Sequence, residues 1–481
     1  MKPRFLLCAL ALHTAAHGVE MDPLLAPIAA HVAGHQDGKA AWSIDFSKMM
    51  GDRAALPIGV FDSGIGGLTV MEAILQMDAL HNDTLQPGPD GIPDFAGERF
   101  LYFGDQANMP YGNYPSRGRE DLLRELIVKD AIFLLGSRWR PARSSAARHD
   151  KPPVKAIVIA CNTATAYGIE DLRTVLRTWD LKVPVIGVIE AGARAVSAAL
   201  PDDQRAHGVA VLATVGTCAS GAYPKAIGRA TGQAGKSAPV VVQQGSVGLA
   251  GAIEGNRAFI EAATKAPVAY QGPTPRPELM AAYGFDPGGL RDAPSGSQLN
   301  SVPNYARYDV TTLLETHRQK GGPAIDTVVL GCTHFPLAQK ELSDAFQLAR
   351  RFTAADGSQP YAAGVAEEVR FIDPAQSTAR ELFRELALAR LRVPDRRASP
   401  AVLPRCDFFF SVPNPESAAR LAADGALEND YKVSRPIGNM TDEDTVVISL
   451  TTTTLPEASA ALVRSLPAVW REMQGASAGA R

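Results

Sequence analysis

Short runs of apolar and β-branched residues recur along the chain without the polar alternation that marks a half-exposed strand. Five of these runs lie at residues 57–61, 155–159, 184–189, 209–212 and 327–330. Strands that are buried on both faces have this pattern, and such strands form parallel sheets that helices cover on both sides. The pattern therefore predicts several buried parallel strands.

Helical patterns follow most of these runs, as at residues 68–77, 164–178 and 337–349. This alternation of strand and helix predicts a doubly wound α/β fold. Stretches rich in Pro, Gly, Ser or Arg interrupt the alternation, and we interpret them as insertions on a compact scaffold. They lie at residues 81–97, 139–153 and 267–305.

The end of the chain has a different pattern. A Thr-rich, strand-like run lies at residues 446–454, and an amphipathic helical pattern follows at 456–473. Neither pattern indicates a function, so the sequence leaves the role of this tail open.

Composition and charge exclude several classes of protein. The chain has 481 residues, and its 48 Lys and Arg nearly balance its 51 Asp and Glu, for a formal net charge of −3. A nucleic-acid binder driven by bulk positive charge is excluded, and anionic lipid has no attraction for such a chain. No apolar run reaches the roughly 18 residues of a membrane span. We expect neither nucleic acid nor a membrane among its partners.

Residues 1–20 have two interpretations. They combine a short basic start, a short apolar core and a small-residue site at Thr14, Ala15 and Ala16. A cleaved signal peptide has these features and would place the protein in the periplasm. An N-terminal extension in front of the first domain is the alternative, and the sequence leaves both open.

Five cysteines are too few for a disulfide scaffold in a chain of this length, and two of them lie in matching contexts. The stretch 156–163 around Cys161 resembles the stretch 326–334 around Cys332. In each, a buried strand ends in a small residue, then a cysteine, and a helix follows. Ligands of open α/β sheets bind at the carboxyl ends of strands, so each cysteine is expected beside such a crevice. A helix N-terminus there would favour the thiolate and lower the cysteine pKa.

Two equivalent cysteines on pseudo-symmetric halves suit the inversion of a carbon centre. Inversion needs a base on one face of the carbon and an acid on the other, and a thiolate with an opposed thiol supplies both. A lone cysteine of this kind would be interpreted as buried and structural. The duplicated context favours catalysis. No His and Cys spacing matches a zinc site, so we expect no metal.

Other polar residues are predicted to share the crevice. Asp62 and Ser63 follow the first strand in a glycine-rich turn that lacks a dinucleotide fingerprint, because Thr69 stands where that motif needs glycine. A turn-rich loop follows the strand at 100–102, and small hydroxyl residues end the strand at 209–212. Each of these features alone is equally typical of turn formation or helix capping.

Taken together, these residues resemble the bacterial glutamate racemases. The segments that carry the resemblance occur in the family's order over residues 57–427, apart from the insertions. They are residues 59–70, 102–105, 110–112, 160–164, 187–190, 330–337 and 371–373. Ala191 and Phe335 depart from the family pattern, which usually has proline and tyrosine there.

The resemblance implies an isomerase, a cofactor-independent glutamate racemase that supplies D-glutamate for peptidoglycan in the cytoplasm. It also implies two pseudo-symmetric doubly wound parallel-sheet domains of α/β class with the active site in the cleft between them. Residues 57–190 with 371–430 would form one discontinuous domain, and 191–370 the other, with an insertion at about 267–305. Residues 431–481 would be a C-terminal extension. A homodimer is compatible with the resemblance.

The resemblance also assigns roles to residues. Cys161 would be the base toward D-glutamate and Cys332 the base toward L-glutamate, while Asp62 and His334 assist their nearest thiols and Glu254 matches a further family carboxylate. The predicted substrate-binding residues are Asp62, Ser63, Pro110, Tyr111, Gly112, Asn162, Thr163, Thr214, Thr217, Thr333 and His334.

Two alternative functions stay open at this point. A racemase of the same superfamily acting on aspartate or a hydantoin differs from a glutamate racemase by little that sequence spacing can measure. An amino-acid-binding protein without catalysis would keep the two-domain cleft, but the presence of both cysteines argues against it.

Overall fold

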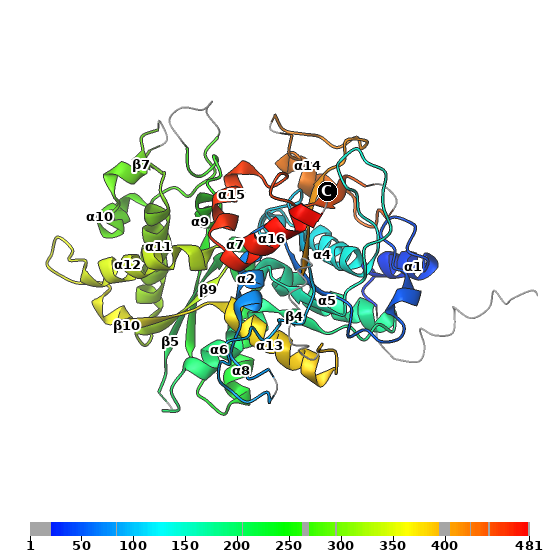
Figure 1. Ribbon diagram of the computed structural model, residues 1–481. Coiled ribbons are helices and arrows are strands. Elements are labelled where there is room, and N and C mark those ends of the chain that lie inside the picture. Colours follow the sequence, from blue (N-terminus) through cyan, green and yellow to red (C-terminus); the bar gives the residue numbers. More distant parts are fainter. Residues whose placement is uncertain are drawn as a thin grey trace, which may run out of the picture.

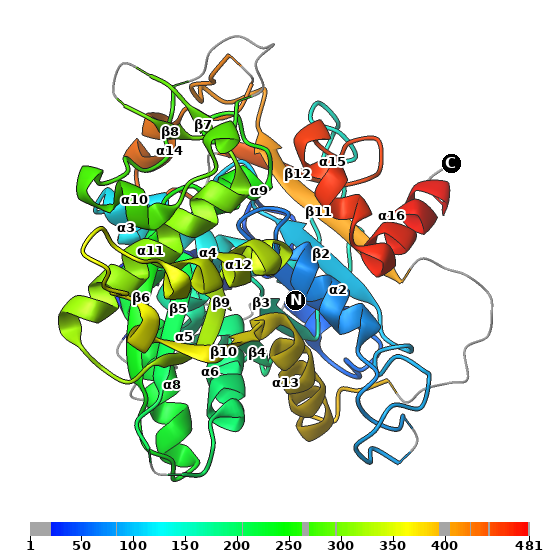
Figure 2. The same ribbon diagram turned by 90° about the vertical axis from the view of Figure 1, so that its left-hand side faces the viewer.

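The computed structural model describes residues 21–82, 84–203, 205–261, 269–293, 296–393, 405–423, 425–440 and 443–479. These residues form two large β-sheets that lie side by side, each covered by helices (Figures 1 and 2). The stretch 1–20, interpreted as a signal peptide or an extension, lies outside the described residues. The predicted α/β class with doubly wound, mainly parallel sheets is confirmed.

The first sheet has six strands in the order β12-β11-β2-β1-β3-β4. All neighbours are parallel except β11 and β12, which are antiparallel. The strands are β1 Ile58–Asp62, β2 Phe100–Gly104, β3 Ala156–Ile159, β4 Val185–Gly187, β11 Cys406–Pro413 and β12 Thr445–Ser449.

Side chains of the central strands enter apolar cores on both faces of this sheet. Ile58 and Val60 of β1 belong to one core and Phe61 to the other, as the two-residue period of a strand requires. Helices that cover the first face are α2 Leu68–Gln76, α13 Pro374–Leu388 and α16 Pro467–Gly479. Helices that cover the second face are α1 Ala26–Gly34, α4 Glu120–Leu135 and α5 Asn162–Thr178.

The second sheet has four parallel strands in the order β10-β9-β5-β6. They are β5 Gly208–Thr214, β6 Val240–Ser246, β9 Ile325–Gly331 and β10 Val365–Ile372. One face packs against α9 Leu249–Ile253, α11 Val302–Lys320 and α12 Gln339–Arg351, and the other against α6 Val188–Ala199 and α8 Ala222–Gln233. Short elements complete the described chain: η1 Phe46–Met49, α3 Asn113–Ser116, α7 Val215–Ser220, η2 Pro277–Leu279, α10 Met280–Tyr283, η3 Pro287–Gly289, β7 Leu290–Arg291, β8 Gln298–Leu299, η4 Phe335–Ala338, η5 Ala362–Gly364, α14 Asn429–Ser434 and α15 Glu457–Arg464.

The tail completes the first sheet. β12 pairs with β11 at the sheet edge, and α16 packs against α2 (Figure 2). The strand predicted at 446–454 is too long, because residues 451–454 form a turn in which Thr451 N–H bonds to Thr454 Oγ1 at 2.8 Å. The single helix predicted at 456–473 is two helices, since α15 ends before Pro467 and proline is accommodated at the first turn of α16.

The insertion expected at 267–305 is shorter than its composition suggested. Residues 302–305 form the start of α11, where the hydroxyl of Ser301 accepts a hydrogen bond from Asn304 N–H at 3.4 Å. Serine and proline were interpreted as loop residues, but here they are a helix cap and a first-turn residue. The rest of the insertion that the structure describes contains η2, α10, η3 and the β7–β8 hairpin.

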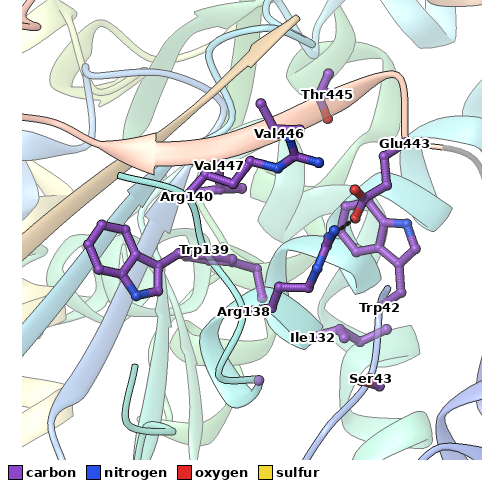
Figure 3. A pocket seen from close by; sticks show the side chains of 12 residues that line it. Trp42, Ser43, Ile132, Arg138, Trp139, Arg140, Glu443, Thr445, Val446 and Val447 are labelled. Atoms are coloured by element: carbon purple, nitrogen blue, oxygen red, sulfur yellow. Dashed lines mark hydrogen bonds and ion pairs between the residues drawn. The ribbon is translucent and has the colours of Figure 1, made fainter. Parts of the chain in front are cut away.

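The segment before β1 is part of the first domain's core, which the sequence did not indicate. Leu25, Ile28 and Val32 at α1 are buried against the second face of the sheet. A pocket lies where this segment, through Trp42, meets the end of α4 and β12, and an ion pair between Arg138 and Glu443 crosses it (Figure 3). None of the predicted site residues lines this pocket.

No helix in the described part of the chain has both the length and the hydropathy to span a bilayer.

A buried carboxyl group in the second domain yields a stability prediction. Asp309 of α11 is 1% exposed, and neither of its carboxyl oxygens has a hydrogen-bond partner among the described residues. Burial raises its pKa from 3.8 to about 7, while the nearby polar side chains of Ser246 and Gln244 oppose the rise only in part. Ionisation of Asp309 therefore disfavours folding, increasingly so from about pH 4 to pH 7.

We expect Asp309→Asn to be more stable than the parent protein, with a difference that grows by about 2 kcal/mol between pH 5.5 and 8.5. The asparagine cannot ionise, so the pH-dependent penalty disappears. Urea unfolding at both pH values measures the difference. Asp344→Asn, at an exposed position of α12, is the control and should show no such pH dependence. A constant difference for Asp309→Asn would contradict the prediction.

Candidate active site

The two matching cysteines follow the carboxyl ends of central strands in the two sheets. Cys161 follows β3 and caps α5, where its Sγ accepts a hydrogen bond from Ala164 N–H at 3.4 Å. Cys332 follows β9. The two residues are only 6% and 7% exposed, so both cysteines are largely removed from bulk water.

Asp62 and Ser63 lie beside Cys161. The thiol of Cys161 donates to Ser63 Oγ at 3.6 Å. Asp62 ends β1, and its Oδ2 accepts hydrogen bonds from the N–H groups of Gly64 and Gly67, each at 3.1 Å. The glycine-rich turn therefore binds the Asp62 carboxylate through its backbone and fixes its position.

Cys332, His334 and Glu254 form a chain of contacts on the other side. Cys332 Sγ lies 3.8 Å from His334 Nδ1, and His334 Nε2 lies 2.7 Å from Glu254 Oε1. Burial opposes the charged form of His334, but the carboxylate of Glu254 and the sulfur of Cys332 raise its pKa well above the ordinary value. This shift favours the imidazolium form of His334, whose Nδ1 faces the sulfur of Cys332.

For Cys161, burial itself is the main cause of the pKa shift. It raises the pKa of this thiol to about 12, assisted by the charge of Asp62, and the hydrogen bonds of the thiol with Ala164 and Ser63 compensate only in part. The prediction that the helix N-terminus lowers this pKa is wrong, because one long N–H contact does not replace the lost hydration. The pKa of Asp62 is also raised by burial, against the opposing effects of His334 and two backbone N–H groups.

The two groups of residues lie next to a contact between the two halves of the protein. A Cβ atom added to Gly66 would lie 2.3 Å from Cε1 of His334 and 2.7 Å from Oγ1 of Thr333. Thr69 Oγ1 also donates to the carbonyl oxygen of Thr333 at 3.0 Å. The turn after β1 thus lies directly against the residues that follow Cys332.

The predicted residues after Cys161 contact the second domain. Asn162 Oδ1 accepts a hydrogen bond from Tyr223 Oη of α8 at 2.6 Å. Thr163 Oγ1 lies 3.1 Å from Thr214 Oγ1 and 3.0 Å from Thr217 Oγ1. Thr214 also caps α7, so the two interpretations of this residue, capping and participation in the site, are compatible.

In the loop of Pro110, Tyr111 and Gly112, the side chain of Tyr111 anchors the loop through hydrogen bonds. The backbone at Gly112 approaches Thr214 at the end of β5. Tyr111 Oη lies 2.6 Å from Asp105 and 2.7 Å from Asp130. Burial and the charge of Asp105 raise the pKa of Asp130 well above its ordinary value, and the hydrogen bond from Tyr111 opposes this rise. A Cβ atom added to Gly112 would lie 3.3 Å from Thr214 Oγ1.

Sequence reasoning missed several residues of this site. Tyr223 lies in a helix without a recognisable motif, and Asp130 lies in the middle of α4, where a buried acid gives no pattern. Gly66 and Thr69 belong to the matched glycine-rich segment, but their contact partners lie more than 260 residues away in sequence.

Comparison with known proteins agrees with this geometry. The profile of the Asp/Glu/Hydantoin racemase family matches residues 140–271. A glutamate racemase from Thermus thermophilus is 34% identical over 341 residues, which are 71% of this chain and 84% of the relative. This chain belongs to the glutamate racemase family. It is therefore an isomerase of the amino-acid racemase class.

Further relatives and solved structures match over a similar part of the chain. A glutamate racemase from Geobacter metallireducens is 28% identical over 67% of this chain and 77% of its own length. Among solved structures, a glutamate racemase isoform from Bacillus anthracis has 24% identity, a TM-score of 0.42 and coverage of 71% of this chain and 85% of that one.

The contact at Gly66 gives a direct test of the closed arrangement. We expect Gly66→Ala to lower racemase kcat/KM by about 100-fold or more, because the new methyl group would displace the His334 ring. The ring cannot turn aside without losing its contacts to Glu254 and Cys332. Initial rates in both directions measure the effect, and the unfolding temperature reports whether the variant is folded.

The control for this change is Gly228→Ala in α8, where an added Cβ atom has no neighbour within 4 Å. Its activity should be unchanged, with stability equal or slightly higher since alanine favours a helix. Full activity of Gly66→Ala would show that the two halves do not need this contact.

Proposed function

We propose that this enzyme interconverts L-glutamate and D-glutamate by proton transfer between two cysteines, without a cofactor. The proposal is supported above all by one observation: Cys161 and Cys332 follow equivalent strand ends, both are buried, and the turn at Gly66 contacts Thr333 and His334 next to Cys332. The family of the chain and the names of its relatives supply the substrate. D-glutamate made in this way would serve peptidoglycan synthesis in the cytoplasm.

The reaction is balanced by two protons. When L-glutamate is converted to D-glutamate, the thiolate of Cys332 takes the Cα proton of L-glutamate, and the bonding electrons remain on the carbon. The thiol of Cys161 then gives its proton to the opposite face and becomes a thiolate. When D-glutamate is converted to L-glutamate, the two cysteines exchange roles, since each is the acid in one direction and the base in the other.

The electrostatics of the site support a defined resting state. With a pKa of about 12, Cys161 is a thiol at neutral pH and can act as an acid. His334 Nδ1 lies 3.8 Å from Cys332 Sγ, and a protonated His334 would stabilise a thiolate there, so we assign Cys332 as the base that acts on L-glutamate. This combination is the one that accepts L-glutamate.

In the conversion of D-glutamate to L-glutamate, Cys161 must lose its proton despite burial and despite the charge of Asp62. Asp62 has a raised pKa of its own and lies at the same strand ends, so it can accept the proton that Cys161 releases. Asp62 would then assist the D-to-L direction, and His334 the L-to-D direction.

We expect Cys161→Ala and Cys332→Ala each to lower racemisation by at least about 1,000-fold, since neither variant retains an acid and a base on opposite faces. Circular dichroism of glutamate follows inversion, and mass spectrometry in D₂O follows exchange at Cα. Exchange without inversion should be confined to L-glutamate in Cys161→Ala and to D-glutamate in Cys332→Ala. Cys218→Ala, outside the site, is the control and should racemise normally.

Racemisation by either cysteine variant within tenfold of the parent rate would exclude the two-thiol mechanism. If the parent enzyme incorporates no deuterium from either enantiomer, the chain binds glutamate without catalysis. Parallel assays with L-aspartate separate the closest alternative, which would turn over aspartate faster. Complementation of a bacterial D-glutamate auxotroph tests the role in the cell wall.

We expect Asp62→Asn to lower kcat mainly in the D-to-L direction and His334→Asn mainly in the L-to-D direction. The equilibrium constant between enantiomers is one, so the ratio of the two kcat/KM values stays fixed and the asymmetry appears in kcat and KM separately. Initial rates in both directions across pH provide the measurement. Equal factors in both kcat values, with KM unchanged, would refute direction-specific assistance.

A further inference from the structure

Two buried cations of the tail contact the loop that carries Pro110, Tyr111 and Gly112. Lys432 of α14 and Arg435, just after it, are each 8% exposed. Lys432 Nζ donates to the carbonyl oxygen of Met109 at 2.6 Å. Arg435 Nη2 donates to Asn108 Oδ1 at 2.6 Å and lies 3.4 Å from Tyr114 Oη. Both cations therefore bind residues directly before Pro110.

The same loop is bound from a second direction within the first domain. Asp105 accepts hydrogen bonds from Asn108 Nδ2 at 2.9 Å and from Ser411 Oγ of β11 at 2.7 Å. Ala107 N–H donates to the same Ser411 hydroxyl at 2.9 Å. Polar groups on this side of the loop are thus engaged by the sheet and by the tail.

The other side of the loop touches the second domain. In addition to the close approach of Gly112 to Thr214, a Cβ atom added to Gly216 would lie 3.0 Å from the carbonyl oxygen of Gly112. Backbone meets backbone here, so a small displacement of the loop changes the domain contact directly.

The tail is itself anchored independently of the loop. Arg119, which precedes α4, donates to the carbonyl oxygens of Val433 and Arg435, the latter at 2.8 Å. Arg435 Nη1 also lies 3.8 Å from the carboxylate of Asp444. These contacts hold the segment of Lys432 and Arg435 in place without the loop.

We propose that Lys432 and Arg435 are positioning residues, which act through Met109 and Asn108 to set the place of Gly112 at the domain contact. The proposal deepens the proposed function and rests on it, since the loop is assigned to substrate binding. Removal of either cation leaves a buried carbonyl or amide oxygen without its charged donor, and the loop would shift to recover a partner.

The test compares Lys432→Met, Arg435→Leu and the conservative Arg435→Lys in the full chain. We expect the first two to raise KM for both enantiomers by about 10-fold, with kcat lowered less than threefold, because the loop would contribute to binding in all states. Arg435→Lys should restore KM to within about threefold. Hydrogen–deuterium exchange should increase at residues 105–114.

Lys340→Met, at an exposed position of α12, is the matched control and should change neither KM nor exchange. Unchanged exchange at 105–114 in both cation variants would overturn the proposal, and so would an unchanged KM despite faster exchange. If Arg435→Leu fails to fold, Lys432→Met alone decides. Backbone hydrogen–deuterium exchange does not require turnover of glutamate. A parent enzyme that is inactive on glutamate would therefore refute the proposed function, while the exchange measurement would still test whether Lys432 and Arg435 support the loop.

Discussion

The site depends on the close contact between the turn after β1 and the residues after Cys332. Gly66 meets His334 and Thr333 at a separation that leaves no room for a side chain, and Thr69 adds a hydrogen bond across the same boundary. This contact joins the turn that follows β1 in the first sheet to the residues that follow Cys332 at the end of β9 in the second. A larger residue at position 66 would separate them.

Burial also shifts the pKa values of ionisable groups in the site. Water is excluded from Cys161 and Asp62, and the loss of hydration raises both pKa values. His334 is equally buried, but its interactions with Glu254 and Cys332 raise its pKa against the effect of burial. The two thiols thus differ in environment although they occupy equivalent positions in their sheets. In the proposed reaction, the two cysteines therefore have different roles for L-glutamate and for D-glutamate.

Segments around the core support this arrangement from outside. The tail contributes Lys432 and Arg435 to the loop before Pro110 and adds β12 to the first sheet. The segment before β1 covers the second face of the same sheet with α1. These additions bury apolar surface of the first domain, which has six strands where the second has four.

The sequence by itself determined the sheet class and the positions of both cysteines, because buried parallel strands and strand-end cysteines are local patterns. It also identified the turn at Asp62 and the residues next to each cysteine through motifs. Only the tertiary structure decided the pairing of His334 with Glu254, the contact of Gly66 and the role of the tail, since each joins residues distant in sequence. The pKa of Cys161 shows why: the helix N-terminus is visible in the sequence, but the burial that outweighs it comes from residues distant in sequence that pack with Cys161 in the folded chain.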